Sequence, residues 1–274
     1  MKNAIYIGSN NRQSLIDFEI PEKFNEEIVI FIHGFMGFKD WGAWNLVQDF
    51  FTSHGFGFCK FNLSHNGGTI DNGIDFPDEI SFGNNTYSKE LNDVFCVLDW
   101  IENQGISNKR IHLIGHSRGG GIALLAANID KRINSVTSWA GISDISSRFP
   151  KGKEIEEWKT KGIRYVQNSR TKQNLAQYYS LYEDFIQNRE ILNIENACRN
   201  LKIPACIIHG DSDSSVPLSE GDANANRLNV SLHIIENSDH VFGASHPWLG
   251  EKLPERLKLV CDISLDFFNR ISQN

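Results

Sequence analysis

The chain has 274 residues, of which 40% are hydrophobic and 22% are charged. This balance excludes a disordered or collagen-like chain, and a chain of this length buries a core without disulfide or metal staples. The formal net charge of −7, with acidic and basic residues interspersed, argues against a nucleic-acid partner.

Nothing in the sequence indicates a membrane or an oxidising compartment. No apolar stretch approaches the ~18 residues of a membrane span, and the first residues lack the apolar core of a signal peptide. The five cysteines are scattered, and none belongs to a C-x-x-C pair. We therefore expect buried free thiols in a cytoplasmic protein without a membrane span. The oligomeric state is left open.

Short apolar runs alternate with amphipathic stretches over the first half of the chain. Residues 28–32 form a β-branched and aromatic run, which predicts a strand buried on both faces. The further elements predicted in this half are helix 44–53, strand 55–61, helix 88–103, strand 110–114, helix 118–128 and strand 133–139.

This alternation is interrupted after Trp139. Residues 141–201 hold charged, helical-looking patches and no convincing strand, and at roughly 60 residues they are too long for a bare loop. Alternation resumes with strand 204–208, helix 218–228, strand 231–235 and helix 253–271.

Strands that alternate with helices predict an α/β fold with a mostly parallel central sheet and helices on both faces. Residues 1–140 and 202–274 are expected to form this core. The interruption at 141–201 is interpreted as an inserted helical cap or lid.

The pattern G-x-S-x-G occurs at residues 115–119, which read Gly-His-Ser-Arg-Gly. It follows an apolar run and opens a helix of small residues, the strand–turn–helix setting that holds a serine on a sharp turn. Side chains in place of the flanking glycines would collide with the neighbouring strand or helix. We predict that Ser117 is a nucleophile. The alternative is a glycine-rich turn whose serine only caps the helix.

A serine nucleophile needs a base, and nine histidines are available. We favour His240, because it follows the predicted strand 231–235 and so lies at the carboxyl edge of the sheet, where sites collect. His246 is the competing neighbour, but the proline after it restricts its backbone. His33 and His209 also end strands, although each precedes a glycine and resembles part of a turn.

The loop 209–217 follows another buried strand and supplies two carboxylates that can orient the histidine. Asp211 is as well suited to a turn, because aspartate bonds nearby backbone amides. Asp213 lies further along the loop and is the better candidate. The chain order Ser117, Asp213, His240 is that of one hydrolase class and differs from the two best-known protease orders.

Negative charge that develops on a substrate carbonyl needs hydrogen-bond donors. The loop after the first buried strand contains Gly34, which lets the backbone fold close to the site. The backbone amides of Phe35 and Arg118 are therefore the predicted oxyanion donors. His33, Gly34 and His116 are candidate substrate-binding residues beside them.

These motifs, taken in order, resemble those of the α/β-hydrolase superfamily, from about residue 28 to the C-terminus. The elements His-Gly-Phe-x-Gly and G-H-S-x-G-G are similar to those of the feruloyl (cinnamoyl) esterase and acyl-aminopeptidase-like branches. The family pattern G-x-x-D-x-x-V-P matches residues 210–217 and supports Asp213 over Asp211. The resemblance implies a serine hydrolase with a Ser–His–Asp triad, a backbone oxyanion hole at the two amides named above, and a lid within 141–201.

The sequence also departs from the family pattern. Residues 62–68 read Asn-Leu-Ser-His-Asn-Gly-Gly where many relatives carry an Asp-x-x-Gly-x-Gly-x-Ser turn, and the loop onward to Phe82 is long and polar. This changes one wall of the expected site without touching the triad. Ser117 argues against two relatives, because dehalogenases have an aspartate there and dienelactone hydrolases have a cysteine.

Substrate preference is expected to lie in the cap, which carries four of the six tyrosines. Trp158, Tyr178 and Tyr182 are candidate substrate-binding residues, because such side chains offer flat apolar faces with a polar tip, suited to an aromatic or medium-length acyl group. The alternative is that they pack the cap onto the sheet.

Arg148, Arg164 and Arg170 are candidates to anchor a substrate carboxylate, and exposed helix charges are the alternative. No metal-ligand spacing and no glycine-rich phosphate loop is present, so we expect neither a metal nor a cofactor. The sequence predicts a carboxylesterase-type serine hydrolase that cleaves a small-molecule ester through an acyl-enzyme. The alternatives are a peptidase or amidase with the same triad and a non-catalytic binding protein on the same fold.

Overall fold

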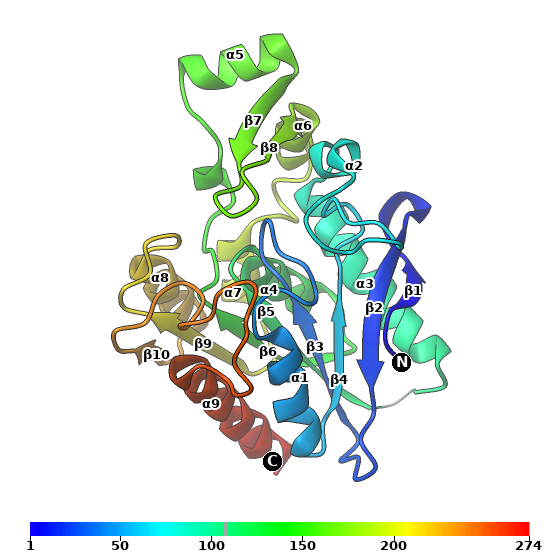
Figure 1. Cartoon of the computed structure of the whole chain (residues 1–274). Coiled ribbons are helices and arrows are strands. Elements are labelled where there is room, and N and C mark those ends of the chain that lie inside the picture. The colour runs from blue at the N-terminus through cyan, green and yellow to red at the C-terminus, as the bar shows by residue number, and fades with distance from the viewer. Residues whose placement is uncertain (107–108, 274) are drawn as a thin grey trace.

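The computed structural model describes residues 1–106 and 109–273. An 8-stranded sheet runs through the molecule in the order β1-β2-β4-β3-β5-β6-β9-β10 (Figure 1). Its strands are β1 (Ala4–Ile7), β2 (Gln13–Glu19), β3 (Glu27–Ile32), β4 (Gly57–Phe61), β5 (Arg110–His116), β6 (Ile133–Trp139), β9 (Ala205–Gly210) and β10 (Leu232–Ile235). Strands β3, β4, β5, β6, β9 and β10 pair in parallel, whereas β1 and β2 pair antiparallel at one edge.

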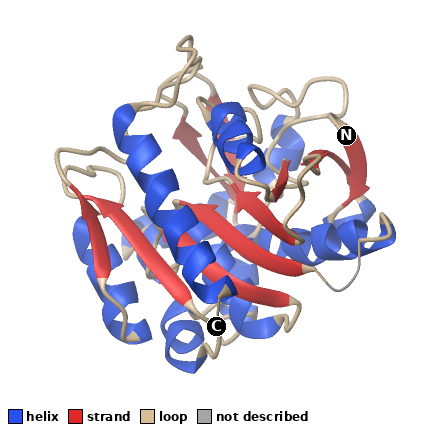
Figure 2. Ribbon diagram, turned by 90° about the horizontal axis from the view of Figure 1, so that it is seen from below, coloured by secondary structure: helices blue, strands red, loops and turns tan. Residues whose placement is uncertain are grey.

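Helices cover both faces of this sheet (Figure 2). On one face lie α1 (Trp44–Ser53) and α9 (Glu255–Ser272), whose apolar side chains share a core cluster with Phe31, Ile114 and Trp139. On the other face lie α3 (Tyr87–Asn103), α4 (Arg118–Ile129), α7 (Ile194–Asn200) and α8 (Leu218–Leu228). The prediction of an α/β fold with a mostly parallel sheet is confirmed.

The five cysteines lie in or beside the apolar core. All five cysteines are free thiols, four of them buried and Cys96 half-buried. Within the part of the chain that the structure describes, no helix has the length and apolar character to cross a bilayer.

The segment between β6 and β9 stands above the sheet as a separate layer in Figure 1. It contains the short 3₁₀ turn η2 (Ser146–Arg148), α5 (Lys153–Lys161), β7 (Ile163–Gln167), β8 (Asn174–Tyr178) and α6 (Ser180–Gln187). The expectation that this segment holds no strand is wrong, because β7 and β8 form an antiparallel hairpin. Both strands are short and carry polar side chains among the apolar ones, so no apolar run marks them.

The end of the inserted segment also lies earlier than residue 201. Helix α7 packs against α4 and α8. Its Ile194, Ala197 and Cys198 belong to the core cluster on the same face of the sheet as those helices. Helix α7 therefore belongs to the core, although the sequence alone assigns it to the cap.

Three further elements have no counterpart among the predicted ones: β1, β2 and the short helix α2 (Glu79–Gly83). Strand β2 is buried along most of its length, but its apolar residues are interrupted by Asp17. A charged residue in that position hides a buried strand from pattern analysis.

Asp17 is tolerated because it belongs to a closed ring of four charges, three buried and one half-buried, which we call the charge ring. Its cations are Lys39 and Lys60, which are 2% and 0% exposed, and its anions are Asp17 and Asp40. Each lysine nitrogen contacts both carboxylates at 2.5–2.8 Å. The ring ties the loop after β3, which carries Lys39 and Asp40, to strands β2 and β4.

Burial would raise the pKa of both carboxyls, but the neighbouring ammonium groups outweigh it and lower the pKa of each. The two carboxyls therefore stay ionised, and removal of one lysine leaves them to share a single ammonium group.

We expect Lys60→Met to lower the free energy of unfolding by about 3–5 kcal/mol, the usual cost of breaking a buried ion pair by removing one partner. Urea unfolding of both proteins measures the loss. Lys258→Met is the matched control, because Lys258 is exposed and pairs only with Asp262 one helical turn away, so its change stays within about 0.5 kcal/mol. Equal stability of the two variants would contradict a structural role for the charge ring.

Candidate active site

Three side chains from three loops meet at the carboxyl edge of the sheet. Ser117 follows β5, Asp213 lies on the loop after β9, and His240 lies on the loop after β10. His240 Nε2 is 2.9 Å from Ser117 Oγ, and His240 Nδ1 is 2.7 Å from Asp213 Oδ2. Because carboxyl ends of parallel strands share one edge, loops far apart in sequence converge there.

Ser117 stands on a strained turn between β5 and α4, with φ +59° and ψ −122°. A Cβ added to Gly115 would lie 2.1 Å from the Gly119 carbonyl oxygen, and one added to Gly119 would lie 2.3 Å from the Ile32 carbonyl oxygen. Both positions therefore require glycine, and the strain at Ser117 is maintained by close backbone packing around it.

The hydrogen bonds around His240 determine its tautomer. The Asp213 carboxylate only accepts, so His240 Nδ1–H donates to it. Nε2 is then left as the acceptor for the Ser117 hydroxyl. A serine hydroxyl bonded to an imidazole that is itself oriented by a carboxylate has the arrangement that activates a serine for nucleophilic attack.

Asp213 is held ionised although its side chain is buried. Burial raises its pKa, but hydrogen bonds from His209 and His240 and the charge of His240 outweigh burial and lower that pKa overall. The backbone amides of Ser215 and Val216 donate to its other oxygen at 2.8 and 2.9 Å. The acceptor of His240 is therefore a permanently charged carboxylate.

His209 belongs to this arrangement, and sequence reasoning had interpreted it only as part of a turn. Its Nε2 lies 3.3 Å from Asp213 Oδ2 and 2.9 Å from the Val216 carbonyl oxygen. The sequence feature that points to His209 is its position at the end of β9, because the carboxyl ends of parallel strands meet at the edge of the sheet where sites form. The structure thus adds a histidine behind the carboxylate.

His33 and His116 flank Ser117 as buried, neutral rings. The Leu63 amide donates to His33 Nε2 at 3.1 Å, and His33 Nδ1 donates to the Gly34 carbonyl. His116 Nε2 donates to the main-chain carbonyl of His240 at 2.8 Å. Burial is the main cause that lowers the pKa of His33 to about 4 and that of His116 to about 3.

The loop after β3 passes directly beside the serine. A Cβ on Gly34 would lie 2.8 Å from Ser117 Cβ and 3.2 Å from its Oγ. The amide of Phe35 follows in this turn, and the amide of Arg118 opens α4 next to the serine. Both amides predicted as oxyanion donors therefore belong to backbone adjacent to Ser117.

The side chain of Arg118 joins these two backbone segments. Its guanidinium lies 4.1 Å from the ring centre of Phe35 and 4.6 Å from that of Tyr87, and it pairs with Glu90 at 3.1 Å. Stacking of this kind stabilises a desolvated arginine between two rings. Arg118 therefore fixes the Phe35 turn relative to the start of α4.

A cavity of about 600 Å³ opens over Ser117 and His240. The residues that line it include the predicted His33, Gly34, Phe35, His116, Ser117, Arg118 and His240, together with Met36, Gly37, Trp41, Trp44, Ile142, Arg148, Asn168, Ser169, Arg170, Ser214, Ser215, Val216, Asp239 and Val241. Residues 168–170 belong to the turn between β7 and β8, so the cap contributes one part of the wall.

The three aromatic residues of the cap that were candidates for substrate binding lie elsewhere. Trp158 is buried and donates its indole N–H to the Gln177 carbonyl, and Tyr182 packs edge-on against Phe149. The Tyr178 ring lies against Gly83 of α2. The structure brings none of them to the cavity wall, because they fill the contact between the cap and the helices beside it.

Two competing residues also have other partners. His246 accepts a hydrogen bond from the Gly42 amide at 2.8 Å and stacks beside Trp41. Asp211 is exposed, and it accepts from the hydroxyl of Ser212 and, at 3.3 Å, from the amide of Ser238. Neither contacts Ser117 or His240. Among the residues that the structure describes, no group of three or more His, Cys, Asp or Glu side chains could hold a metal ion.

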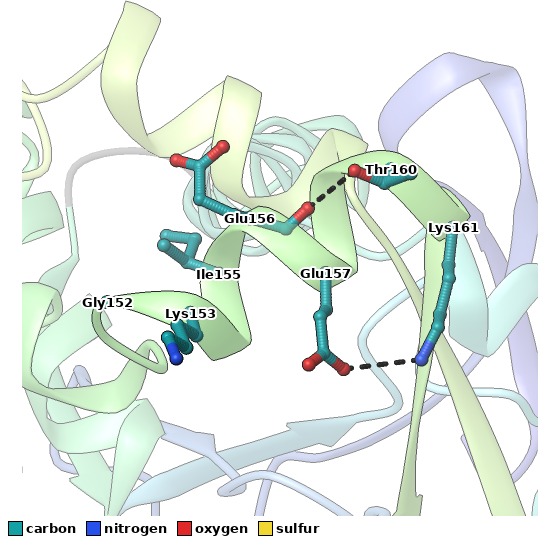
Figure 3. A pocket seen from close by; sticks show the side chains of 7 residues that line it. All are labelled: Gly152, Lys153, Ile155, Glu156, Glu157, Thr160 and Lys161. Atoms are coloured by element: carbon teal, nitrogen blue, oxygen red, sulfur yellow. Dashed lines mark hydrogen bonds and ion pairs between the residues drawn. The ribbon is translucent and has the colours of Figure 1, made fainter.

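A second cavity, of about 840 Å³, lies along the exposed helix α5 and shares no lining residue with the cavity over Ser117 (Figure 3). Its walls come from residues 152–161 alone, with an ion pair between Glu157 and Lys161 and a hydrogen bond from Thr160 to the Glu156 carbonyl. It contains no histidine and no paired nucleophile and base, so it offers no comparable chemistry.

Comparisons with known proteins identify the family and the fold. The profile of the prolyl oligopeptidase family matches residues 44–253. An uncharacterised 31.7 kDa protein of Escherichia coli, from the traX–finO intergenic region, is 28% identical over 131 residues, which are 47% of this chain and 42% of that protein. The chain thus matches less than half the length of this relative.

Two solved structures share the α/β-hydrolase fold over nearly the whole chain. Est1E from Butyrivibrio proteoclasticus, with ferulic acid bound, has a TM-score of 0.75 at 19% identity and covers 99% of this chain and 100% of its own. Alpha/beta hydrolase domain-containing protein 10 from mouse has a TM-score of 0.70 at 18% identity and covers 98% of both chains.

The buried titratable groups predict how stability depends on pH. Burial lowers the pKa of His33 and His65 to about 4 and of His116 to about 3, from an ordinary value of 6.5. In the opposite sense, burial raises the pKa of Asp93 to about 6 and also raises that of Glu90. Between pH 6 and 4 the unfolded chain binds the three histidine protons, whereas the folded chain binds the proton of Asp93. The raised pKa of Glu90 acts in the same sense as that of Asp93.

We expect the free energy of unfolding to fall as the pH falls through this range. The slope is about 1.4 kcal/mol per pH unit for each proton that the unfolded chain binds in excess of the folded chain. Urea unfolding at pH 7, 6, 5 and 4.5 measures the slope. Asp93→Asn removes one opposing proton and makes the slope steeper, whatever its effect at neutral pH. A stability that stays constant or rises toward pH 4.5 would show that the histidines are not neutral in the folded protein.

Proposed function

Because the chain belongs to the prolyl oligopeptidase family, a family of serine hydrolases, we propose that it cleaves carboxylic esters of small molecules through an acyl-enzyme intermediate. The observation that carries this proposal is the 2.9 Å contact between Ser117 Oγ and His240 Nε2, with Asp213 at 2.7 Å behind the same ring. This arrangement supports roles for Ser117 as nucleophile, His240 as base and Asp213 as the carboxylate that orients it.

In the first step Ser117 Oγ attacks the ester carbonyl carbon, and its proton passes to His240 Nε2. The charge that develops on the carbonyl oxygen is accepted by the amides of Phe35 and Arg118, and one such donor is typically worth about 2.7–4 kcal/mol in the transition state. Asp213 stabilises the imidazolium that forms.

The tetrahedral intermediate then collapses, and the bond to the leaving oxygen breaks as His240 gives it the proton. An alcohol leaves, and the acyl group stays on Ser117 as an ester. Water repeats the sequence with His240 as base, which releases the acid and restores the serine hydroxyl.

The family match also supports a second candidate function, hydrolysis of a peptide or amide bond by the same triad. The two candidates differ in the leaving group, since an amine needs its proton earlier than an alkoxide does. Rates on a p-nitrophenyl ester and a p-nitroanilide with the same acyl group separate them. A higher kcat/KM on the anilide would overturn the ester proposal in favour of the amidase.

We expect a fluorophosphonate probe to label the protein at Ser117, and Ser117→Ala to abolish both labelling and turnover of p-nitrophenyl acetate. Loss of the nucleophile of such a triad costs on the order of 10⁶ in kcat. Mass spectrometry of the labelled peptide identifies the site. Folded protein that remains unlabelled at Ser117 would refute the proposal and would favour a non-catalytic binding protein on the same fold.

Asp213→Asn is expected to lower kcat by about 10⁴ while the fold is kept, because the amide no longer fixes the correct histidine tautomer. Asp211→Asn is the matched control on the same loop: its carboxylate is exposed and accepts hydrogen bonds from Ser212, Asn237 and Ser238 rather than from His240, so activity is retained. Steady-state kinetics on one ester measures both. Equal losses in the two variants would contradict the assignment of Asp213.

A further inference from the structure

The wall of the cavity over Ser117 is cationic, although the whole chain carries a net charge of −7. Its ionised side chains are Arg118, Arg148 and Arg170 against the single acidic residue Asp239. Asp239 already accepts hydrogen bonds from the amides of Val241 and Gly243 at 3.2 and 2.8 Å. An acidic protein that lines the cavity over Ser117 with arginines presents a local field that attracts anions.

The three arginines differ in what occupies them. Arg118 is enclosed between two aromatic rings and paired with Glu90, so its guanidinium is committed. Arg170 pairs with Asp75 on the loop after β4 and ties the cap hairpin to that loop. Arg148 pairs through Nη2 with Glu220.

Arg148 is the cavity-lining arginine with an unused hydrogen-bond donor. It ends the 3₁₀ turn η2 at the start of the cap, and its Nε is buried with no hydrogen-bond partner among the residues that the structure describes. Glu220, from α8, also accepts from the Ser143 amide at 2.8 Å and does not line the cavity. The Arg148 guanidinium is thus held by an acceptor that does not line the cavity, and it keeps a donor that is not used. A buried donor without an acceptor lowers the stability of the folded protein.

The surroundings of Arg148 strengthen its positive field. Arg118, Arg148 and Arg164 all act electrostatically on the ring of Tyr87. Arg164 stacks on Trp158 at 4.2 Å, bonds to Gln177 and makes no ion pair with any carboxylate among the described residues. Of these three cations, Arg118 and Arg148 are ion-paired, with Glu90 and Glu220 respectively.

We propose that the natural substrate of this site carries a carboxylate on its acyl portion, and that Arg148 binds it. Arg148 lines the cavity, and a planar guanidinium matches a carboxylate through two parallel hydrogen bonds. This inference rests on the proposed ester hydrolysis and deepens it: the substrate is a half-ester of a dicarboxylic acid or a related anionic acyl ester, rather than a neutral aromatic ester. Arg148 is then a specificity-determining residue.

The test compares p-nitrophenyl esters in pairs that differ only at the far end of the acyl chain: hemiglutarate against butyrate, hemiadipate against valerate, and hemisuberate against heptanoate. We expect the wild-type protein to prefer the charged member by roughly ten-fold or more in kcat/KM at the best chain length, as a bidentate ion pair allows. Arg148→Gln removes this preference, and Arg148→Lys restores part of it. The ratio within a pair cancels any general loss of active protein.

The control is Arg199→Gln, an exposed arginine of α7 that pairs with Glu195 one turn away and does not line the cavity. We expect Arg199→Gln to keep the wild-type ratio of kcat/KM between the charged and the neutral ester of each pair. Loss of the ratio in Arg170→Gln but not in Arg148→Gln would overturn the assignment to Arg148. A wild-type preference for the neutral ester at every chain length would overturn the carboxylate itself.

A binding measurement separates this inference from the proposed function. Calorimetry on Ser117→Ala, which cannot turn over, compares adipate with hexanoate. We expect adipate to bind more tightly, and a further Arg148→Gln change to remove the difference. If esters are hydrolysed through Ser117 but neither the ratio nor the binding favours the dianion, only this inference fails. If Ser117 is unreactive while adipate still binds through Arg148, only the proposed function fails.

Discussion

The backbone contact between β5 and α4 is the constraint on which the rest of the site depends. Gly115 and Gly119 lie so close across the turn that a single Cβ at either position would overlap a neighbouring carbonyl. This contact holds Ser117 at a positive φ and brings the end of β3 against the start of α4. Ser117 and the loop with the Phe35 amide are therefore positioned by close backbone packing rather than by contacts between flexible side chains.

Around this turn, burial and hydrogen bonding assign each titratable group its charge. Asp213 stays ionised because two backbone amides and two histidines face it. His33 and His116 stay neutral because they are enclosed. The charge ring around Lys60 ties the loop after β3 to β2 and β4, so the antiparallel edge of the sheet supports the loop beside the serine.

The parts of the fold that followed from the sequence are those whose residues alternate regularly. The buried parallel strand β3 carries an unbroken apolar run, β5 is apolar over residues 111–114 apart from His112, and the helices beside them show an apolar face. The hairpin of β7 and β8 was missed, because its strands have no such run and are held by each other and by the helices beside them. Strand β2 was missed because Asp17 interrupts it, and only Lys39 and Lys60, from distant segments, make that aspartate acceptable.

By itself, the sequence determined the fold class and identified Ser117, Asp213 and His240 as candidates, since each lies just after a predicted strand and parallel strands end at one edge. It offered Trp158, Tyr178 and Tyr182 as candidates to line a pocket, with packing of the cap as the alternative, and their rings fill contacts within the cap and beside α2. Only the tertiary structure decided that Arg148 and the turn 168–170 line the cavity instead. The physical reason is that strand ends are positioned by the period of the sheet, whereas a cap side chain is positioned by packing against partners that are remote in sequence.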